Sequence, residues 1–369
     1  MRLYYHLWNV AVSLTPRRLK LLQNEFGNLK EAWRRAGKAT IRALDVEEAR
    51  IDEIVTRIRE IDPARQEEFL KKNGIDFVTQ DEDTYPSILR EIHGPPAMLY
   101  WKGARPDFER PCVAIVGTRM PTEYGREVTA HFASRLAESG FTVVSGFAEG
   151  VDQAAHSAAL LAGGETIGVL GSGLQKIYPE NDRELLHDMC TRGTLISEFS
   201  PDMDSMPFNF PIRNRIISGL CLGVLVIEAQ AKSGALITAK LAIEHNREIF
   251  AVPGSIKSPK SDGTNALIQK SEAMLVTRPD EIIDVLRERV PVTYEINGSD
   301  DEKKLLDLMN QRPKPIDELI RESGLSPAKV NAILATLVLQ DRVKQKGGGL
   351  YSLPRPRCVT SHDTPHLEL

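Results

Sequence analysis

The stretch Thr142–His156, TVVSGFAEGVDQAAH, decides the fold, because it passes from a short apolar run through a glycine-bearing turn into a helix. The run Thr142–Val144 is β-branched, which is typical of a buried strand. Gly146 and Gly150 lie on either side of the turn, and glycines there let the backbone approach another group closely. The stretch therefore predicts one strand–turn–helix unit.

Comparable apolar runs recur on both sides of this unit and alternate with helical stretches. They lie at 113–116, 142–144, 166–170, 195–196, 224–227 and 249–252. This alternation predicts an α/β fold with an extended Rossmann-like, doubly wound and mostly parallel sheet. Ligands of such sheets bind outside the carboxyl ends of the strands, so the loops that follow the strands form the candidate site.

The segment before the sheet, residues 1–72, carries apolar residues at helical spacing, such as Leu19, Leu22 and Phe26. It predicts a small helical N-terminal domain of the SAM or helix-hairpin-helix type. Thr15 suits the cap of one helix and Pro16 its first position. Helix-hairpin-helix modules bind the DNA backbone at such turns, but a bundle that contacts only protein explains the pattern equally well.

The segments after the sheet predict a separate C-terminal unit. The Rossmann-like domain is predicted over residues 73–290, a charged linker over 291–300 and a winged-helix domain over 301–355. Within the last, three helical stretches precede a hairpin around Gly347–Gly349. The tail 356–369 lacks periodicity and is rich in Pro, Thr, Ser and His, which predicts disorder.

Four lysine and asparagine side chains of the winged-helix domain are candidate DNA contacts: Lys329, Asn331, Lys344 and Lys346. They are too few to predict that the domain reads a DNA groove. In such modules contact with another protein is about as common as duplex binding, so the partner of this domain stays open.

The whole-chain composition is that of an ordinary globular protein, with 41% hydrophobic and 27% charged residues. The formal net charge is −4 and the sequence pI about 6.1, so any nucleic-acid surface must be local. His6 and Asn9 interrupt the apolar residues before a signal-peptide core forms, and no run is long enough to span a membrane. A cytoplasmic location without membrane insertion is expected.

The four cysteines, Cys112, Cys190, Cys221 and Cys358, lie far apart and lack the spacing of metal ligands. They are expected to be free thiols in a reducing compartment. No carboxylate spacing in the chain matches a metal motif, so no metal is predicted.

Glycine-bearing loops follow nearly every predicted strand. Gly117-Thr118-Arg119 and Ser233-Gly234 each open a helix after a strand and suit an anion, because helix N-termini carry free N–H groups and partial positive charge. Gly171-Ser172-Gly173 invites a dinucleotide interpretation, but the third glycine is missing and Tyr178-Pro179 breaks the helix that would receive the pyrophosphate. No cofactor is therefore predicted.

The run Phe208–Ile217 places two aromatic residues beside Arg213 and Arg215. Arginine next to aromatic rings is the pairing that stacks bases and neutralises phosphates. A structural alternative is that both arginines form salt bridges inside the fold, for example with Glu198 or Glu228. Contact with DNA or a nucleotide is favoured, and Arg119 and Arg215 are expected to converge on one phosphate track.

His156 lies on a helix one turn after Asp152, which resembles a catalytic pair. No serine or cysteine nucleophile with a supporting motif accompanies them. A structural hydrogen bond is the favoured role for His156, and no catalytic residue is predicted.

From Val113 to Asn265 these loops together resemble the DNA-processing protein A family, also called DprA or Smf. The matching stretches are GTR at 117–119, TEYG at 122–125, VVSGFAEGVDQAAH at 143–156, GSGLQKIYP at 171–179, FPIRNRIISGL at 210–220, EAQAKSGALITA at 228–239 and AVPG at 251–254. The resemblance implies a non-enzymatic, homodimeric protein that binds single-stranded DNA and loads the RecA recombinase during natural transformation.

The loops and the resemblance together give a set of candidate DNA-binding residues. The set is Gly117, Thr118, Arg119, Ser145, Gly146, Phe210, Arg213, Asn214, Arg215, Ser233 and Gly234. The resemblance further implies a dimer face at Asn265, Leu267 and Ile268. Two departures from the family pattern are Pro207, where some relatives have lysine, and Ser271-Glu272-Ala273, which is one residue longer than the usual turn.

Two alternatives come from other functional classes. Nucleotide hydrolases of the lysine-decarboxylase-like superfamily share a related Rossmann domain, but their Pro-Gly-Gly-x-Gly-Thr loop is absent and only Glu228 keeps this interpretation open. The other alternative is a winged-helix regulator whose Rossmann domain senses a nucleotide.

Overall fold

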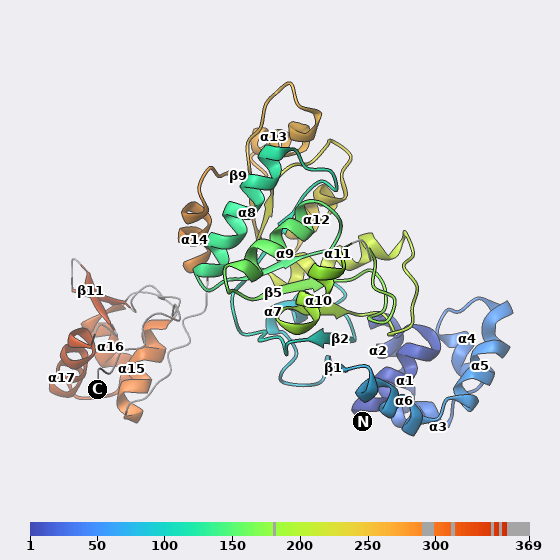
Figure 1. Ribbon diagram of the computed structural model, residues 1–369. Coiled ribbons are helices and arrows are strands. Elements are labelled where there is room, and N and C mark those ends of the chain that lie inside the picture. The colour runs from blue at the N-terminus through green and yellow to red at the C-terminus, as the bar shows by residue number, and fades with distance from the viewer. Residues whose placement is uncertain (180–181, 290–298, 311–313, 341–342, 347–348, 353–369) are drawn as a thin grey trace, which may run out of the picture. The chain divides into compact units, whose positions relative to one another are not determined.

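The computed structural model describes residues 1–179, 182–289, 299–310, 314–340, 343–346 and 349–352 (Figure 1). The chain folds as two compact units, Met1–Ile283 and Asp284–Val359. The predicted boundaries at residues 72, 290 and 300, and the predicted disorder of the tail at 356–369, stay predictions, and the tail lies outside the described residues.

The first unit contains a nine-stranded sheet in the order β1-β2-β6-β5-β4-β3-β7-β8-β9. Its strands are β1 Ile75–Thr79, β2 Met98–Gly103, β3 Cys112–Val116, β4 Thr142–Ser145, β5 Thr166–Val169, β6 Thr194–Ser197, β7 Gly223–Val226, β8 Glu248–Ala251 and β9 Met274–Leu275. From β6 to β9 every neighbouring pair is parallel, while β1 pairs antiparallel with β2 and β2 with β6. The predicted doubly wound, mostly parallel sheet is confirmed.

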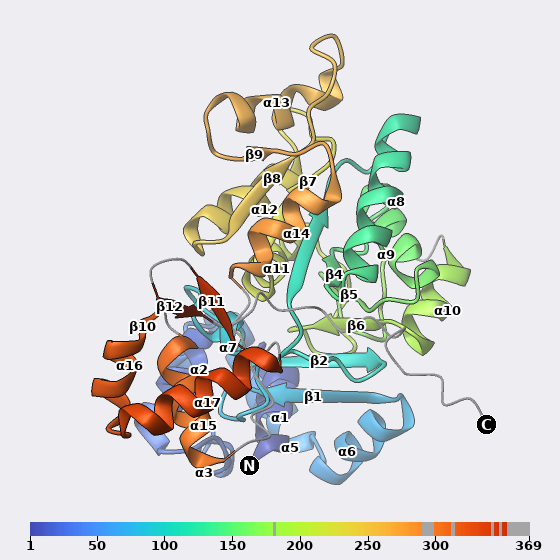
Figure 2. The ribbon, with the colours of Figure 1, turned by 90° about the vertical axis from the view of Figure 1, so that its left-hand side faces the viewer.

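Helices cover both faces of this sheet, which is why strands β3 to β7 are buried at every position. The helices of this region are α7 Ser87–Arg90, α8 Glu123–Glu138, α9 Val151–Leu161, α10 Arg183–Thr191, α11 Asn209–Leu220, α12 Gly234–Glu244, α13 Asp262–Gln269 and α14 Pro279–Arg287. Helices α8 and α9 lie on one face, and α11 and α12 on the other (Figure 2).

The strand order reverses at β3, since the chain first builds β4, β5 and β6 on one side and then returns to place β7 on the other. Val113 to Val116 pair in parallel with Gly223 to Val226. The carboxyl ends of β3 and β7 therefore form the topological switch point, where open α/β sheets bind their ligands.

The N-terminal helices are α1 Arg2–Val12, α2 Pro16–Phe26, α3 Leu29–Arg34, α4 Lys38–Ala43, α5 Ile51–Glu60 and α6 Pro63–Lys72. Thr15 caps α2 by accepting a hydrogen bond from the Arg18 N–H, and Pro16 occupies the first turn. One hydrophobic cluster runs from Trp8 of α1 to Tyr100 of β2, so these helices share a core with the antiparallel edge of the sheet.

His6 joins α1 to the sheet as a buried polar contact. Its Nδ1 lies 2.8 Å from the Tyr100 hydroxyl and its Nε2 lies 3.0 Å from Gln66 Oε1. Burial lowers the pKa of His6 to about 4, despite the opposing effect of the Gln66 hydrogen bond. The neutral ring is therefore the form that the folded protein holds.

Neutral His6 makes folding sensitive to acid. The folded-state pKa of His6 lies below the unfolded value of about 6.5. The stability that neutral His6 contributes is therefore fully present above pH 6.5 and is lost as the pH falls toward 4. Replacing His6 with glutamine is expected to reduce the loss of stability across this range by up to about 1.4 kcal/mol per pH unit. Urea unfolding at several pH values measures it, and equal pH slopes for both proteins would contradict this role.

The second unit has the three helices and the small sheet of a winged-helix domain. Its elements are α15 Asp300–Asn310, β10 Lys314–Pro315, α16 Ile316–Ser323, α17 Pro327–Leu339, β11 Lys344–Lys346 and β12 Leu350–Ser352, with sheet order β10-β12-β11. Leu305, Leu319, Leu334 and Val343 contribute to its own buried core. The predicted winged helix is confirmed.

Candidate nucleic-acid interface

A cavity of about 400 Å³, termed the switch-point pocket, lies at the carboxyl ends of β3 and β7. Most of the predicted DNA-binding residues line it: Gly117, Thr118, Arg119, Phe210, Arg213, Asn214, Ser233 and Gly234. These residues come from the loop after β3, from α11 and from the start of α12. The sheet thus brings together segments that are more than a hundred residues apart in the sequence.

One wall of the switch-point pocket is suited to an anion. Ser233 caps α12 by accepting a hydrogen bond from the Ala235 N–H, and the helix N-terminus opens on the pocket. A Cβ atom on Gly234 would meet nothing within 4 Å, so the backbone there is open to a ligand. Arg119 and Lys232 are exposed beside it. Helix N–H groups and two cations at one place are suited to binding a phosphate.

Phe210 is the aromatic centre of the pocket. The guanidinium carbon of Arg119 lies 5.8 Å from the centroid of its ring, and that of Arg213 lies 6.0 Å away. Tyr178 contacts the ring edge-on, with 6.4 Å between the ring centroids. A half-buried ring with cations beside it offers a surface on which a base stacks while phosphates are neutralised.

The Gly171-Ser172-Gly173 loop supports this ring and holds no dinucleotide fingerprint. A Cβ on Gly171 would lie 2.9 Å from the Phe210 ring, and a Cβ on Gly173 would collide with the Pro201 carbonyl. No helix follows the loop, because the described chain runs through turns to Tyr178 and Pro179. The glycines here make room for neighbouring protein atoms.

Arg213 and Asp152 are both buried, Arg213 lies beside Phe210, and the charges of the two groups interact electrostatically. Burial lowers the pKa of Arg213 to about 10, with Asp152 raising and Arg119 lowering it, so the guanidinium is charged at neutral pH. Burial raises the pKa of Asp152, opposed chiefly by Arg213. The Asp152 carboxylate also accepts hydrogen bonds from the backbone N–H groups of Gly146 and Ala148. Asp152, which the sequence did not assign to DNA binding, therefore holds the turn and favours the charged form of Arg213.

The remaining residues of the VVSGFAEG turn have different places. Gly146 lines a small adjoining cavity with Arg119 and Phe210, and a Cβ on Gly146 would overlap the Arg213 guanidinium. Ser145 is fully buried and donates its hydroxyl to the Ile115 carbonyl at 2.6 Å, so it joins β4 to β3 and does not face the switch-point pocket.

Arg215 lies away from the switch-point pocket, which corrects the expected convergence with Arg119. It belongs to α11, where residues two positions apart do not share a face, so Arg213 and Arg215 point in different directions. Arg215 pairs with Glu198 at 2.6 Å and lines a second cavity with it. Both side chains are largely buried, with 16% and 13% of their surfaces exposed. This is the salt bridge that the structural alternative named.

His156 has the structural role favoured from the sequence. Its Nδ1 lies 2.6 Å from Thr166 Oγ1, and the Thr166 hydroxyl donates to the Val143 carbonyl. Burial, and to a lesser degree the charge of Arg213, lowers the pKa of His156 to about 3. The ring is therefore neutral in the folded protein.

Glu228, on which the hydrolase alternative depends, is bound to the start of α8. Its carboxylate accepts hydrogen bonds from the Thr122 N–H at 2.8 Å and the Thr122 hydroxyl at 2.6 Å, and only 4% of the residue is exposed. Negative charge at a helix N-terminus is stabilising. The carboxylate thus caps α8, and this accounts for its presence without a reaction.

The residues of the expected dimer face lie on α13. The Asn265 side chain exchanges two hydrogen bonds with the Gly254 backbone, and Leu267 is buried in the hydrophobic core of its own chain. Ile268 is partly exposed. Of the apolar pair, Ile268 is the side chain with surface available to a partner.

None of the helices in the described part of the chain is long and apolar enough to cross a membrane. Among the same residues, histidine, cysteine and carboxylate side chains do not gather in groups of three that would hold a metal ion.

Two family models match the chain. The model for DNA recombination-mediator protein A matches residues 76–287, and the model for the DprA winged helix domain matches residues 293–349. Similar curated proteins include Protein Smf of Synechocystis, 32% identical over 388 residues, which cover 94% of this chain and 98% of that protein. DNA processing protein DprA of Bacillus subtilis is 40% identical over 220 residues, which cover 59% of this chain and 74% of that protein.

Two solved structures share the fold at similar identity. DNA processing protein A from Streptococcus pneumoniae superposes with a TM-score of 0.64 at 34% identity, covering 76% of this chain and 97% of that one. DNA processing protein A from Helicobacter pylori, whose structure was reported with a single-stranded DNA binding mode, superposes with a TM-score of 0.53 at 32% identity. The match covers 58% of this chain and 97% of that one. With both family models and a full-length relative in agreement, the chain belongs to the DNA recombination-mediator protein A family.

Proposed function

We propose that this protein binds single-stranded DNA in its switch-point pocket, without catalysing a reaction, and passes the strand to the RecA recombinase during natural transformation. The observation that carries the proposal is the meeting of Arg119, Phe210 and the N-terminus of α12 in one cavity. The Helicobacter pylori relative, described with a single-stranded DNA binding mode, supports it. The cytoplasm, where the recombinase acts, is the proposed location.

The chemistry of the pocket suits a single strand better than a duplex. Phe210 offers a ring face to an unpaired base, and a base in a duplex keeps its faces stacked on its neighbours. Arg119, Lys232 and the start of α12 line the same pocket as Phe210, so they are placed to bind the phosphate next to a base stacked on that ring. Neither ring stacking nor phosphate contact distinguishes the four bases, so binding with little base preference is expected.

The test is an equilibrium titration of the full chain with oligothymidylate and with a duplex of equal length, at several salt concentrations. Single-strand affinity is expected to exceed duplex affinity and to fall steeply with salt, because binding releases counterions from the phosphates. Equal affinity for the two DNAs at moderate salt would contradict the proposal.

Transfer to the recombinase needs a separate assay. The protein is expected to shorten the lag in RecA filament growth on oligothymidylate that is already coated with a single-strand-binding protein. A variant that lacks the Arg119 side chain should lose this effect in proportion to its loss of DNA binding. An unchanged lag with the wild-type protein would contradict the proposed transfer to RecA and would not affect the proposed binding of single-stranded DNA.

A homodimer through α13 is part of the proposal. Ile268 is the partly exposed apolar side chain there, so replacing it with glutamate would place a charge in the interface. Light scattering is expected to give a dimer for the wild type and a monomer for Ile268→Glu. The control is Leu161→Glu on α9, where the residue is 84% exposed. A wild-type monomer at high protein concentration would contradict the prediction.

A further inference from the structure

Tyr178 is an exposed aromatic residue beside the proposed DNA site that was not assigned to DNA binding from the sequence. It follows the Gly171-Ser172-Gly173 loop, and 52% of the residue is exposed. Its ring contacts the Phe210 ring edge-on, so the two side chains form one aromatic surface. The Tyr178 ring is therefore both supported by a neighbouring ring and accessible to a ligand.

Arg119 and Phe210 connect Tyr178 to the start of α12. Both line the switch-point pocket and the small cavity beside it, whereas Ser233 and Gly234 line only the pocket and Tyr178 only the small cavity. The small cavity has about 30 Å³, far less than a small-molecule site, so a base does not enter it. A base that reaches Tyr178 lies on the exposed part of its ring. The order along the surface is thus the N-terminus of α12, then Arg119 with Phe210, then Tyr178.

The surroundings of Tyr178 suit a base better than a phosphate. Apart from Arg119, the described residues that line the small cavity carry no positive charge: they are Gly146, Ala148, Glu149, Tyr178, Pro179 and Phe210. Glu149 adds a negative charge, which disfavours a phosphate there. Aromatic rings stack with any of the four bases, because every base has a π-face. The contact expected at Tyr178 is therefore stacking alone.

The angle between the two rings restricts the DNA that can use both. The ring planes of Tyr178 and Phe210 are inclined by 61°, with 6.4 Å between their centroids. Bases stacked flat on both rings are inclined by a similar angle, so the strand has to bend between them. Adjacent bases of a duplex lie nearly parallel at about 3.4 Å along each strand, so a duplex cannot stack on both rings.

We propose that Tyr178 is a second base-stacking residue, which holds the nucleotide next to the one stacked on Phe210. This inference rests on the proposed binding of single-stranded DNA and extends it from one stacked base to two. Arg119, which lines both cavities, contacts the phosphate between the two nucleotides. The strand therefore bends at Arg119, with one base on each ring.

The test compares the affinity of the full chain for oligothymidylate with that for an equally long strand of abasic sites, which keeps every phosphate and lacks every base. Tyr178→Ala is expected to weaken oligothymidylate binding at least about fivefold, the low end of what stacking one base on an aromatic ring contributes. Binding of the abasic strand, measured at low salt, and the slope of log affinity against log salt should not change, because no phosphate contact is lost. Unchanged oligothymidylate binding, or an equal loss on both strands, would overturn the proposal.

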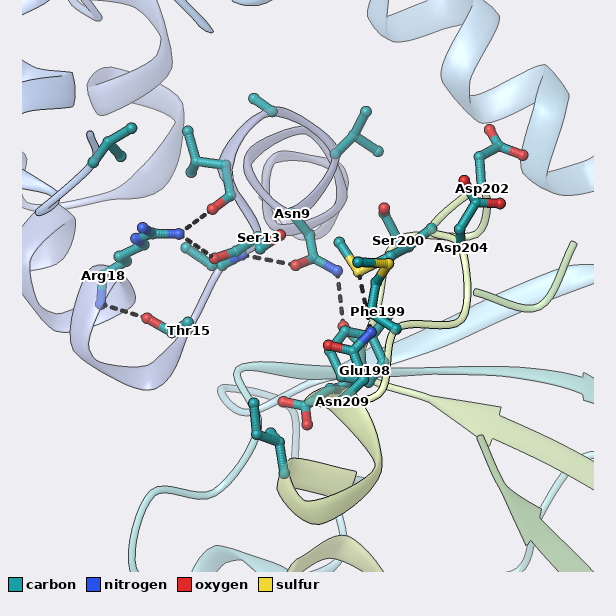
Figure 3. Close-up of a pocket in the computed structure, with 18 of the residues that line it drawn as sticks. Asn9, Ser13, Thr15, Arg18, Glu198, Phe199, Ser200, Asp202, Asp204 and Asn209 are labelled. Carbon is teal, nitrogen blue, oxygen red and sulfur yellow. Dashed lines mark hydrogen bonds between the residues drawn. The ribbon is translucent and has the colours of Figure 1, made fainter. Parts of the chain in front are cut away.

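Two further variants serve as controls. Tyr178→Phe keeps the ring and loses only the hydroxyl, so it is expected to bind like the wild type. Phe208→Ala removes another exposed ring, which lines the second cavity, drawn in Figure 3, and should not change binding. Melting temperatures check that each variant folds, and Tyr178→Leu replaces the alanine variant if that one does not. A Tyr178→Phe protein as defective as Tyr178→Ala would contradict stacking.

A double variant separates stacking on Tyr178 from an indirect effect through Phe210. If Tyr178 stacks its own base, Phe210→Ala with Tyr178→Ala binds oligothymidylate more weakly than either single variant. Equal affinity of the double variant and Phe210→Ala would show that Tyr178 only supports the Phe210 ring, and would overturn the inference. Weakened binding in Phe210→Ala with none in Tyr178→Ala would overturn the inference and leave the DNA-binding proposal standing. No binding of oligothymidylate by the wild type would refute both.

Discussion

Replacing Arg119 with alanine is expected to lower the affinity for oligothymidylate by about 10- to 100-fold without changing the melting temperature. A hydrogen bond to a charged group contributes about 1.5–3 kcal/mol, and each 1.4 kcal/mol is about a tenfold change in affinity. Arg119 is exposed beside Phe210, so its loss removes a phosphate ligand without disturbing the core. The slope of log affinity against log salt should become shallower by about 0.7.

Two controls sharpen this measurement. Arg119→Lys keeps the charge but loses the planar fork, so an intermediate affinity is expected. Arg105→Ala removes another exposed charge and should leave binding unchanged, because the neighbouring Ala104 is bonded to Gly193 at the amino end of β6 and Arg105 does not line the switch-point pocket. If Arg119→Ala binds like the wild type with the same salt slope, or if Arg105→Ala is equally defective, the assignment of the switch-point pocket is wrong.

Replacing Arg215 with alanine is expected to destabilise the protein by about 3 kcal/mol, at the low end of the cost of breaking a buried ion pair. The loss leaves the Glu198 carboxyl largely buried without its ion-pair partner, and burial then raises the pKa of Glu198 without opposition from Arg215. For a unit of this size the melting temperature should fall by about 6–12 °C. Affinity for oligothymidylate, measured well below that temperature, should be unchanged, because Arg215 lies outside the switch-point pocket.

The double variant tests whether Glu198 is the reason. Adding Glu198→Gln to Arg215→Ala removes the uncompensated charge and is expected to recover part of the lost stability. Thermal unfolding of the wild type, both single variants and the double variant gives the coupling free energy between Arg215 and Glu198. A normal melting temperature for Arg215→Ala, together with weakened DNA binding, would show that Arg215 contacts DNA.

The parallel strands β3 to β8 could be predicted because each contains a short apolar run rich in β-branched residues. A strand that is buried on both faces is recognised from such a run alone. Strands β1, β2 and β9 were not predicted. The first two pair antiparallel and lie among turns that obscure any alternation with helices, and β9 has only two residues. Much of the pocket followed from one rule, that loops after parallel strands meet at one edge. Arg119, Ser233 and Gly234 were found in this way.

The side on which each α11 residue lies could not be predicted in the same way. No helix was assigned to Phe208–Ile217 from the sequence, whereas a helix begins at Asn209 and accommodates Pro211 in its first turn. The helix places Arg213 and Arg215 on different faces. The buried partner of Arg215 is Glu198, 17 residues earlier in the chain. The role of Asp152 could not be predicted because its hydrogen-bond donors are backbone N–H groups, which every residue except proline carries.

The central claim is that single-stranded DNA passes over Phe210, and photo-crosslinking tests it most directly. A benzophenone side chain is placed at Phe210 in one protein and at Phe208 in another, since these neighbours line different cavities on the two sides of α11. Irradiation with labelled oligothymidylate is expected to crosslink strongly at position 210 and weakly at position 208, with excess unlabelled strand abolishing the signal. Strong crosslinking at 208 with none at 210 would contradict the claim.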